Sequence, residues 1–219
     1  MTDTRTITVV TAGLSQPSST RLLADRLAQA VVARLGSVDN AADGVSAEVH
    51  VVELRDLAQD ITNNLLTGFA APKLAAAIER LTASDGVIFV TPIFTTSYSG
   101  LFKSFIDVLD PDALSGMPVL LAATGGTERH SLALEYAMRP LFTSLHAVVA
   151  PTTVYAASGD WGSTGDVAAY AGGGGLPERI DRAAGELAAL VRDSDRSSRV
   201  RDPFALPAGF SPVGSFGAQ

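Results

Sequence analysis

TITVVTAGLSQPSSTRLLADRLAQAVVARLG (residues 6–36) joins a continuous apolar run to a segment whose apolar residues recur at helical spacing. The first part (6–12) is apolar on both faces, which suits a parallel strand covered by helices on each side. The periodic part (20–36) ends at Gly36, a residue that commonly stops a helix. We therefore expect a strand, a turn rich in hydroxyl groups, and a helix.

The same alternation of short apolar runs and helix-period segments continues along the chain. The other expected strands are 45–54 (a half-exposed edge strand), 85–91, 117–124 and 147–155, the last interrupted by Pro151. The other expected helices are 72–84, 100–110, 131–147 with a kink at Pro140, and 176–195. A polar loop is expected at 37–46 and a flexible glycine-rich segment at 158–177. Strict alternation favours an α/β fold with a doubly wound parallel sheet and helices on both faces.

Composition narrows the class of protein. The 219 residues, 47% of them apolar, fit one domain at 1–195 followed by a tail at 196–219 that contains Pro, Gly and Phe. The absence of cysteine excludes thiolate catalysis and cysteine-ligated metal, and the three histidines lack metal-site spacing, so no metal is expected. A net charge of −7 argues against nucleic acid and anionic membranes as partners. Without a membrane span or a secretory signal, we expect a cytoplasmic location.

The candidate site lies in three loops that follow expected strands. In a doubly wound sheet, ligands bind beyond the carboxyl ends of the strands, so loops 12–20, 91–100 and 123–131 should meet there. The first loop places hydroxyl groups at the start of a helix, where unpaired N–H groups attract anions. It has neither the GxGxxG of a dinucleotide site nor a Walker lysine, which favours a single phosphomonoester. The alternative is that Ser18 or Ser19 only caps the helix.

These loops resemble those of a known family. GLSQPSSTRLLADRL (13–27) is similar to the phosphate loop of flavodoxin-like NAD(P)H-dependent FMN reductases, and TPIFTTSYSGLFKSFIDVLD (91–110) is similar to their P-x-Y-x-x-S segment. ATGGTERHSLALEYAMRPLF (123–142) resembles their third loop and the helix after it. The resemblance covers about residues 5–155 and implies a five-stranded flavodoxin-like sheet in the order 2-1-3-4-5. Within the family, the chain is most similar to an actinobacterial subgroup that accompanies luciferase-like flavin monooxygenases.

The resemblance also assigns cofactor contacts to individual residues. The FMN phosphate is expected among Ser15, Ser18, Ser19 and Thr20, with Arg21 as a weaker candidate. The isoalloxazine ring is expected beside Pro92, Ile93, Phe94 and Thr95, with Ser97 at the position of the family serine. The pyrimidine edge is expected along Thr124, Gly125 and Gly126, where glycine allows close backbone approach. Phe94 replaces the usual tyrosine, so a hydroxyl contact is lost there.

The implied activity is that of an NAD(P)H:FMN oxidoreductase. Hydride passes from the nicotinamide to flavin N5, so FMN and NAD(P)H are the expected cofactors and no catalytic acid or base is required. The resemblance further implies that reduced FMN is supplied to a flavin-dependent monooxygenase. It also implies a homodimer or tetramer, with helices 100–110 and 131–147 at the interface. The alternatives are an FMN-containing quinone or azo reductase, and a flavodoxin-type electron carrier without hydride chemistry.

Several other residues have more than one interpretation. Lys103 and Asp107 stand four apart and predict an ion pair on a helix rather than a catalytic pair. His130 either touches substrate or caps a helix. Trp161 covers either the flavin or a neighbouring subunit, and Tyr98 offers aromatic cover near the ring. Phe94 itself has the alternative of a core position.

Overall fold

The computed structural model describes residues 4–36, 45–161 and 175–194. The expected tail at 196–219, most of the glycine-rich segment expected at 158–177, and most of the loop expected at 37–46 lie outside the described residues.

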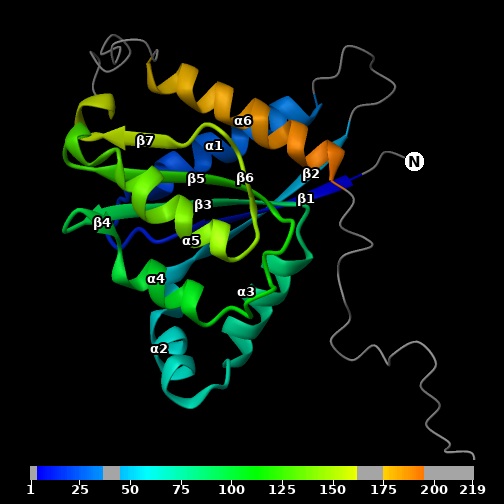
Figure 1. The fold of residues 1–219 in the computed structure, drawn as a ribbon, viewed down its shortest axis with the longest axis vertical. Coiled ribbons are helices and arrows are strands. Elements are labelled where there is room, and N and C mark those ends of the chain that lie inside the picture. The colour runs from blue at the N-terminus through cyan, green and yellow to red at the C-terminus, as the bar shows by residue number, and fades with distance from the viewer. Residues whose placement is uncertain (1–3, 37–44, 162–174, 195–219) are drawn as a thin grey trace, which may run out of the picture.

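The parallel sheet has the expected doubly wound order (Figure 1). β1 (Thr4–Thr11) lies between β2 (Ser46–Glu53) and β3 (Gly86–Phe94), and β3 pairs on its other side with β5 (Pro118–Gly125). β5 pairs in turn with two short strands, β6 (Val148–Val149) and β7 (Val154–Ala157). All these pairs are parallel, so the carboxyl ends of the strands meet at one edge of the sheet.

Helices cover both faces of this sheet (Figure 1). One face packs against α1 (Ser19–Gly36) and α6 (Leu176–Asp193). The other packs against α2 (Ala58–Thr67), α3 (Pro72–Ala83), α4 (Gly100–Asp107) and α5 (Arg139–Ser144).

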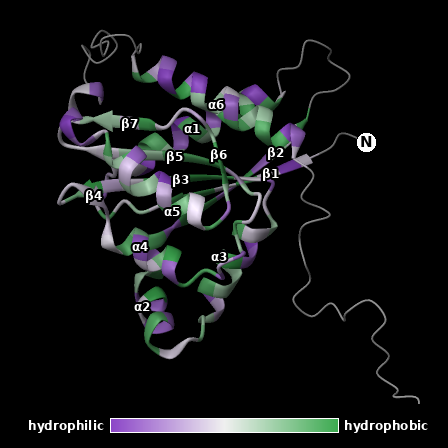
Figure 2. Ribbon diagram, viewed as in Figure 1, coloured by the Kyte–Doolittle hydropathy of each residue, from purple (hydrophilic) through white to green (hydrophobic). Residues whose placement is uncertain are grey.

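The two faces of the sheet have separate hydrophobic cores. Within β3, Ile88 and Val90 belong to the core under α1 and α6, whereas Val87 and Phe89 belong to the opposite core. Successive side chains of a strand point to opposite faces, and here both faces are buried, which explains the continuous apolar runs of the sequence. Figure 2 shows the central strands as the most uniformly hydrophobic part of the fold.

Within the described ranges, the sheet has seven strands rather than the five expected. The expected strand 147–155 is divided into β6 and β7 because Pro151 has no N–H group for pairing. The next N–H group, that of Thr152, donates to the Glu186 carboxylate at 2.6 Å instead of to β5. The seventh strand, β4 (Ser97–Tyr98), folds back antiparallel on the end of β3.

Two helical segments also differ from expectation. The helix expected at 131–147 is broken into a π-helical turn at Leu134–Met138 and α5, and Pro140 stands in the first turn of α5, where a missing N–H group costs little. The short 3-10 turn Leu54–Leu57 and α2 were not expected. Leu54, Leu57 and Ile61 bury their side chains at spacings of three and four, which is the helical signal in that stretch.

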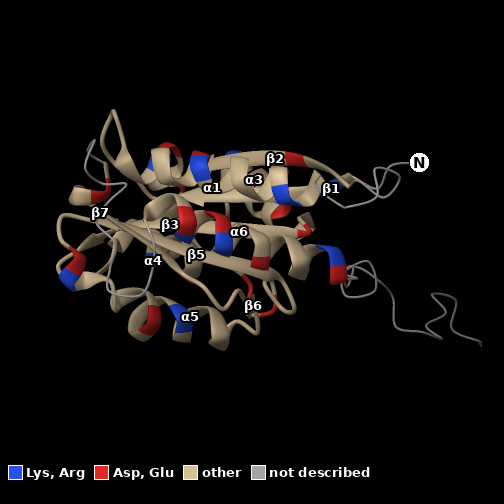
Figure 3. Ribbon diagram, turned by 90° about the horizontal axis from the view of Figure 1, so that it is seen from above, with Lys and Arg blue, Asp and Glu red and all other residues tan. Residues whose placement is uncertain are grey.

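Charges of both signs are interspersed over the surface helices (Figure 3). As expected, Lys103 and Asp107 form an ion pair along α4, with 2.5 Å between Nζ and Oδ1. Of the helices in the described ranges, none combines the length and apolar character that crossing a bilayer requires.

Candidate functional site

A cavity of about 950 Å³ opens at the carboxyl edge of the sheet. Its walls come from the loops after β1, β3 and β5 and from the residues that follow β7. The volume lies within the ~300–1,000 Å³ usual for small-molecule sites. The structure therefore brings together the three loops on which the sequence prediction depends.

The first loop presents an anion-binding helix start to this cavity. Ser15, Ser18, Ser19 and Thr20 all line it. The Ser18 hydroxyl accepts a hydrogen bond from the Arg21 N–H group at 3.2 Å, so Ser18 caps α1 as well as facing the cavity. In the described part of the chain, the N–H groups of Ser19 and Thr20 have no acceptor. These two donors and the positive end of the α1 dipole fit a phosphate group.

Packing fixes the course of the first loop. A Cβ atom on Gly13 would overlap the Ser18 hydroxyl, so a larger residue there would displace the hydroxyl that caps α1. Below the loop, Thr20 Oγ1 and Thr124 Oγ1 share a buried hydrogen bond of 2.8 Å. That bond links the start of α1 to the end of β5, and it uses the proton of only one of the two hydroxyls. The Thr20 N–H group is a donor for an anion whichever of the two hydroxyls donates.

The third loop contributes Thr124, Gly125 and Gly126 to the wall. A Cβ atom on Gly125 would overlap the Tyr155 hydroxyl and lie 2.9 Å from Tyr155 Cζ. That hydroxyl donates to the Thr127 carbonyl at 2.7 Å. Glycine at position 125 thus makes room for a tyrosine beneath the loop, whereas Gly126 faces open space. Burial raises the pKa of Tyr155, with smaller contributions from nearby carboxylates, so the phenol stays neutral as a donor.

The second loop contributes Pro92, Ile93 and Phe94 at the end of β3. Phe94 is 49% exposed and lines the cavity, which argues against the alternative core position. The hairpin to β4 turns through Thr95 and Thr96, whose φ angles are 48° and 69°. Positive φ is unusual for a β-branched residue, so this turn beside the cavity carries backbone strain.

Three of the predicted cofactor residues do not line the cavity. Thr95 is exposed in the strained turn, and Ser97 lies in β4 opposite Phe94. Arg21 points away, because its guanidinium pairs with Asp25 at 2.8 Å and with Glu53. Their assignments stay predictions, and Arg21 is the one whose side chain is already engaged elsewhere.

Tyr98 and Ser99 have structural roles near the same loop. Tyr98 packs on Phe102 with ring centroids 5.9 Å apart, so its ring belongs to the core beneath the loop. The Ser99 hydroxyl accepts from the Phe102 N–H group and caps α4. The Ser99 N–H group donates to the Thr91 hydroxyl at 3.1 Å, which ties the start of α4 to β3.

Several lining residues had no role predicted from the sequence. Leu14, Pro17 and Ser158 complete the rim, and Leu22 and Arg26 extend the wall along α1. Ser19, Leu22 and Arg26 stand at spacings of three and four on one helix face, which is the signal that identifies them. Trp161, for which the sequence left two roles open, also lines the cavity. Arg26 Cζ lies 5.2 Å from the centroid of the Trp161 ring.

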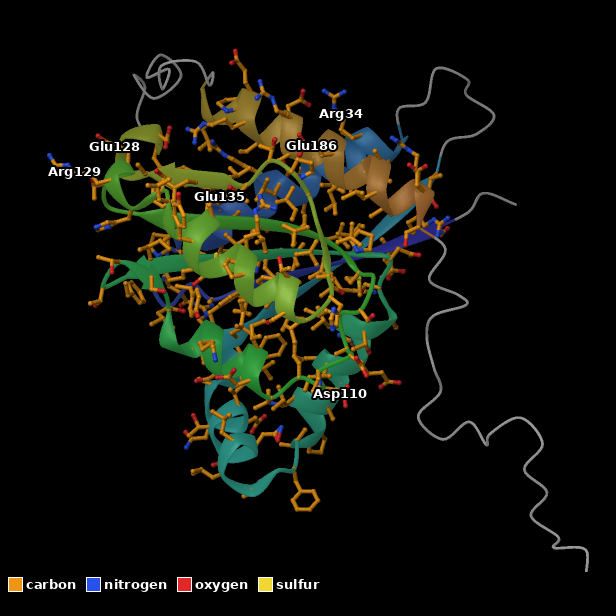
Figure 4. All side chains as sticks on the ribbon, in the orientation of Figure 1. Arg34, Asp110, Glu128, Arg129, Glu135 and Glu186 are labelled. Atoms are coloured by element: carbon orange, nitrogen blue, oxygen red, sulfur yellow. The ribbon has the colours of Figure 1, made fainter. Side chains whose placement is uncertain are left out.

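Charged side chains lie outside the cavity, and one ion pair among them supports the turn beside it. In Figure 4, Glu128 and Arg129 lie at the carboxyl edge of the sheet, whereas Arg34 lies at the far end of α1. Asp160, just before Trp161, accepts from Arg179 at 2.7 Å and from the Ala157 N–H group at 2.8 Å. Both side chains of this ion pair are mostly buried. The pair fixes the turn that carries Trp161.

Comparison with known proteins places this geometry in a family. The family model described as NADPH-dependent FMN reductase matches residues 5–162. An FMN reductase (NADPH) of Pseudomonas aeruginosa is 36% identical over 74% of this chain and 81% of its own length. An NADH-dependent FMN reductase of Pseudomonas putida is 34% identical over 68% of this chain and 76% of its own. The crystal structure of an oxidoreductase from Corynebacterium diphtheriae, 44% identical, superimposes with a TM-score of 0.78 over 89% of this chain and all of the other. The chain thus belongs to the family of NADPH-dependent FMN reductases, oxidoreductases built on a flavodoxin-like fold.

Proposed function

We propose that this chain binds FMN in the cavity at the carboxyl edge of the sheet and transfers hydride to it from NADH or NADPH. The observation that supports this most directly is the convergence of the three predicted loops on one cavity, with the open start of α1 in its wall. When bound there, FMN supplies N5 as the acceptor of hydride from the nicotinamide C4.

The residues of this chain bind and orient the reactants. The N–H groups of Ser19 and Thr20, with the hydroxyls of Ser15 and Ser19, hold the phosphate at the start of α1. Pro92, Ile93 and Phe94 form the apolar wall for the ring, and the Gly125–Gly126 backbone follows its polar edge. Tyr155 supports that backbone from below. No side chain has to exchange a proton for the hydride step itself.

We further propose that FMN is a substrate that leaves after reduction and reaches a flavin-dependent monooxygenase. The exposure of the cavity rim supports this, because Leu14 is 52% exposed and Phe94 is 49% exposed. An open rim of this kind leaves a path by which a ligand can leave the cavity. A quinone or azo reductase would instead hold FMN through many turnovers.

The test is oxidation of NADH and NADPH by the purified protein while FMN is titrated from zero. Turnover that rises and saturates with FMN supports a flavin substrate, and turnover without added FMN indicates a bound prosthetic flavin. FMN binding without any oxidation would overturn the reductase in favour of an electron carrier.

The double variant Ser15→Ala/Ser19→Ala should weaken FMN binding about tenfold or more, because hydrogen bonds to a charged group are lost. Ser115→Ala is the matched control, since Ser115 is exposed and far from the cavity walls.

We also propose that the chain forms a homodimer or tetramer through the segment 131–147. Leu132 is 61% exposed and Tyr136 is 78% exposed, and they stand four residues apart. Such a pair on one helical turn fits burial against a second copy. Light scattering should give a multiple of the 22.6 kDa chain mass, and Tyr136→Glu should lower it. A monomeric wild-type protein would refute this proposal.

A further inference from the structure

We propose that Arg26 and Trp161 form a second anion subsite of the cavity, which binds a phosphate group of the nicotinamide nucleotide. This inference rests on the proposed function and assigns the second reactant to a place on the wall. It starts from the position of Arg26. Arg26 lines the same cavity as Ser19 but follows it by seven residues on α1, which is about 10 Å along the helix axis.

Trp161 determines where the guanidinium of Arg26 lies. The Arg26 Cζ atom stands 5.2 Å from the centroid of the indole ring, within the range of a cation–π contact. Trp161 follows β7, so this contact draws the guanidinium toward the β7 side of the cavity and away from the first turn of α1. A phosphate seated on the N–H groups of Ser19 and Thr20 therefore leaves Arg26 available for another anionic group.

In the part of the chain that the structure describes, no carboxylate forms an ion pair with Arg26. Arg21, Arg55 and Arg139 each form an ion pair with a neighbouring acidic side chain. Among the described residues, no such pair involves Arg26. Of the side chains that line the cavity, that of Arg26 alone carries a charge within the described ranges. A positive group of this kind, in a chain of net charge −7, is a specific feature of the cavity rather than part of a general basic surface.

The geometry of the contact fits phosphate recognition. A guanidinium uses its flat face for stacking on an aromatic ring, which leaves the N–H groups at its edge directed outward. That edge matches two oxygens of a phosphate and forms charge-assisted hydrogen bonds with them. Trp161 acts as a positioning residue, because its ring lies 5.2 Å from the Arg26 Cζ atom and attracts the guanidinium to this side of the cavity. The turn that carries it is held by the ion pair of Asp160 with Arg179.

The reactants of the proposed reaction identify the second anion. FMN carries one phosphate, for which the start of α1 is the fitting seat. NADH and NADPH carry a pyrophosphate, and NADPH carries a further phosphate on the adenosine ribose. With the FMN phosphate at the start of α1, these phosphates need a different anion site. Arg26 offers the matching charge.

The experiment measures nucleotide binding separately from turnover. Calorimetry gives the affinity of the FMN-loaded protein for NADP⁺ and NAD⁺, and FMN affinity is measured on the flavin-free protein. The variants are Arg26→Gln, Arg26→Lys and the control Arg80→Gln, which removes the same charge from an exposed site on α3. Arg26→Gln should weaken nucleotide binding about tenfold or more and raise KM for the nucleotide, with kcat and FMN affinity within about twofold. Arg26→Lys should recover part of the loss, and Arg80→Gln should match the wild type.

The pattern of loss identifies the phosphate. A loss confined to NADP⁺ assigns Arg26 to the ribose phosphate, and an equal loss for both nucleotides assigns it to the pyrophosphate; either supports the subsite. Weaker FMN binding with unchanged nucleotide binding would overturn it and place Arg26 at the flavin phosphate. Unchanged binding of all ligands would also overturn it. In both of these outcomes, NAD(P)H oxidation by the wild-type enzyme would leave the proposed function standing. A wild-type protein that binds the nucleotide without oxidising it would refute the proposed function but not the anion subsite.

Discussion

Asp160→Asn should destabilise the protein strongly, because Asp160 joins the end of β7 to α6. Its carboxylate accepts from Arg179 at 2.7 Å and from the Ala157 N–H group at 2.8 Å. The Asp160 side chain is 5% exposed and that of Arg179 15%. Asparagine retains one oxygen for the backbone N–H group but removes the negative charge that faces the guanidinium.

The expected cost follows from this burial. Removing one partner of a buried ion pair costs about 3–5 kcal/mol in general. Arg179 also donates to the Tyr155 carbonyl and keeps some contact with water, so we expect a cost just below this range, about 2–3 kcal/mol. With a urea dependence of about 2–3 kcal/mol per molar, the unfolding midpoint should fall by about 1 M.

Equilibrium unfolding in urea, followed by far-UV circular dichroism, measures this shift. Asp107→Asn is the matched control, because its pair with Lys103 lies on the surface of α4 and should contribute only about 0.3–0.5 kcal/mol. A shift for Asp160→Asn no larger than that of the control would refute the reasoning. It would mean that the turn at 158–161 opens without unfolding the rest of the domain.

Three further substitutions test other parts of the fold. Gly125→Ala should cost about 1–3 kcal/mol and weaken FMN binding, because the new methyl group displaces Tyr155; an unchanged thermal midpoint would contradict this. Arg139, mainly through its hydrogen bond, lowers the pKa of the Glu135 carboxyl, so the stability it contributes is fully present above the unfolded pKa, near 4.5, and is lost as pH falls through the lower folded pKa. The melting difference between wild type and Glu135→Gln should therefore shrink from pH 7 to pH 3, and a constant difference would exclude this linkage. Thr96→Gly should raise the melting temperature by about 2–4 °C, because glycine relieves the positive φ; a lower melting temperature would show that the turn is not strained.

The order of the sheet and the place of the site were predictable from sequence for one physical reason. Parallel strands buried on both faces appear as continuous apolar runs, such as 85–91, and the loop after each run necessarily lies at the carboxyl edge. The loops after β1, β3 and β5 could thus be placed together without knowledge of any contact.

The segments that the sequence did not predict correctly are those in which the burial pattern and the local residue propensities disagree, or in which a contact distant in sequence decides the structure. In α2, the buried Ile61 continues the spacing of Leu54 and Leu57, but Asn63, Asn64 and two threonines weaken the helical propensity of the stretch. The fifth strand position was recognised, and so was the interruption at Pro151. That the chain resumes pairing at Val154 depends on the hydrogen bonds of Thr152 to Glu186 on α6, a contact distant in sequence.

The side chains of the cavity also depend on contacts between residues that are distant in sequence. Ser18 satisfies both interpretations of its loop, since it caps α1 and faces the cavity, and no local pattern distinguishes the two roles. Arg21 was a phosphate candidate because it follows the hydroxyls, yet Asp25 and Glu53 draw it away. Arg26, five residues later on α1, is the residue whose charge lies in the cavity wall, where its guanidinium lies beside the Trp161 ring. The two residues are 135 positions apart, so no pattern along the chain joins them. If the nucleotide subsite is correct, the turn after β7 contributes to nucleotide binding as directly as the loop after β1, and a substitution that loosens it, such as Asp160→Asn, should raise the nucleotide KM along with its cost in stability.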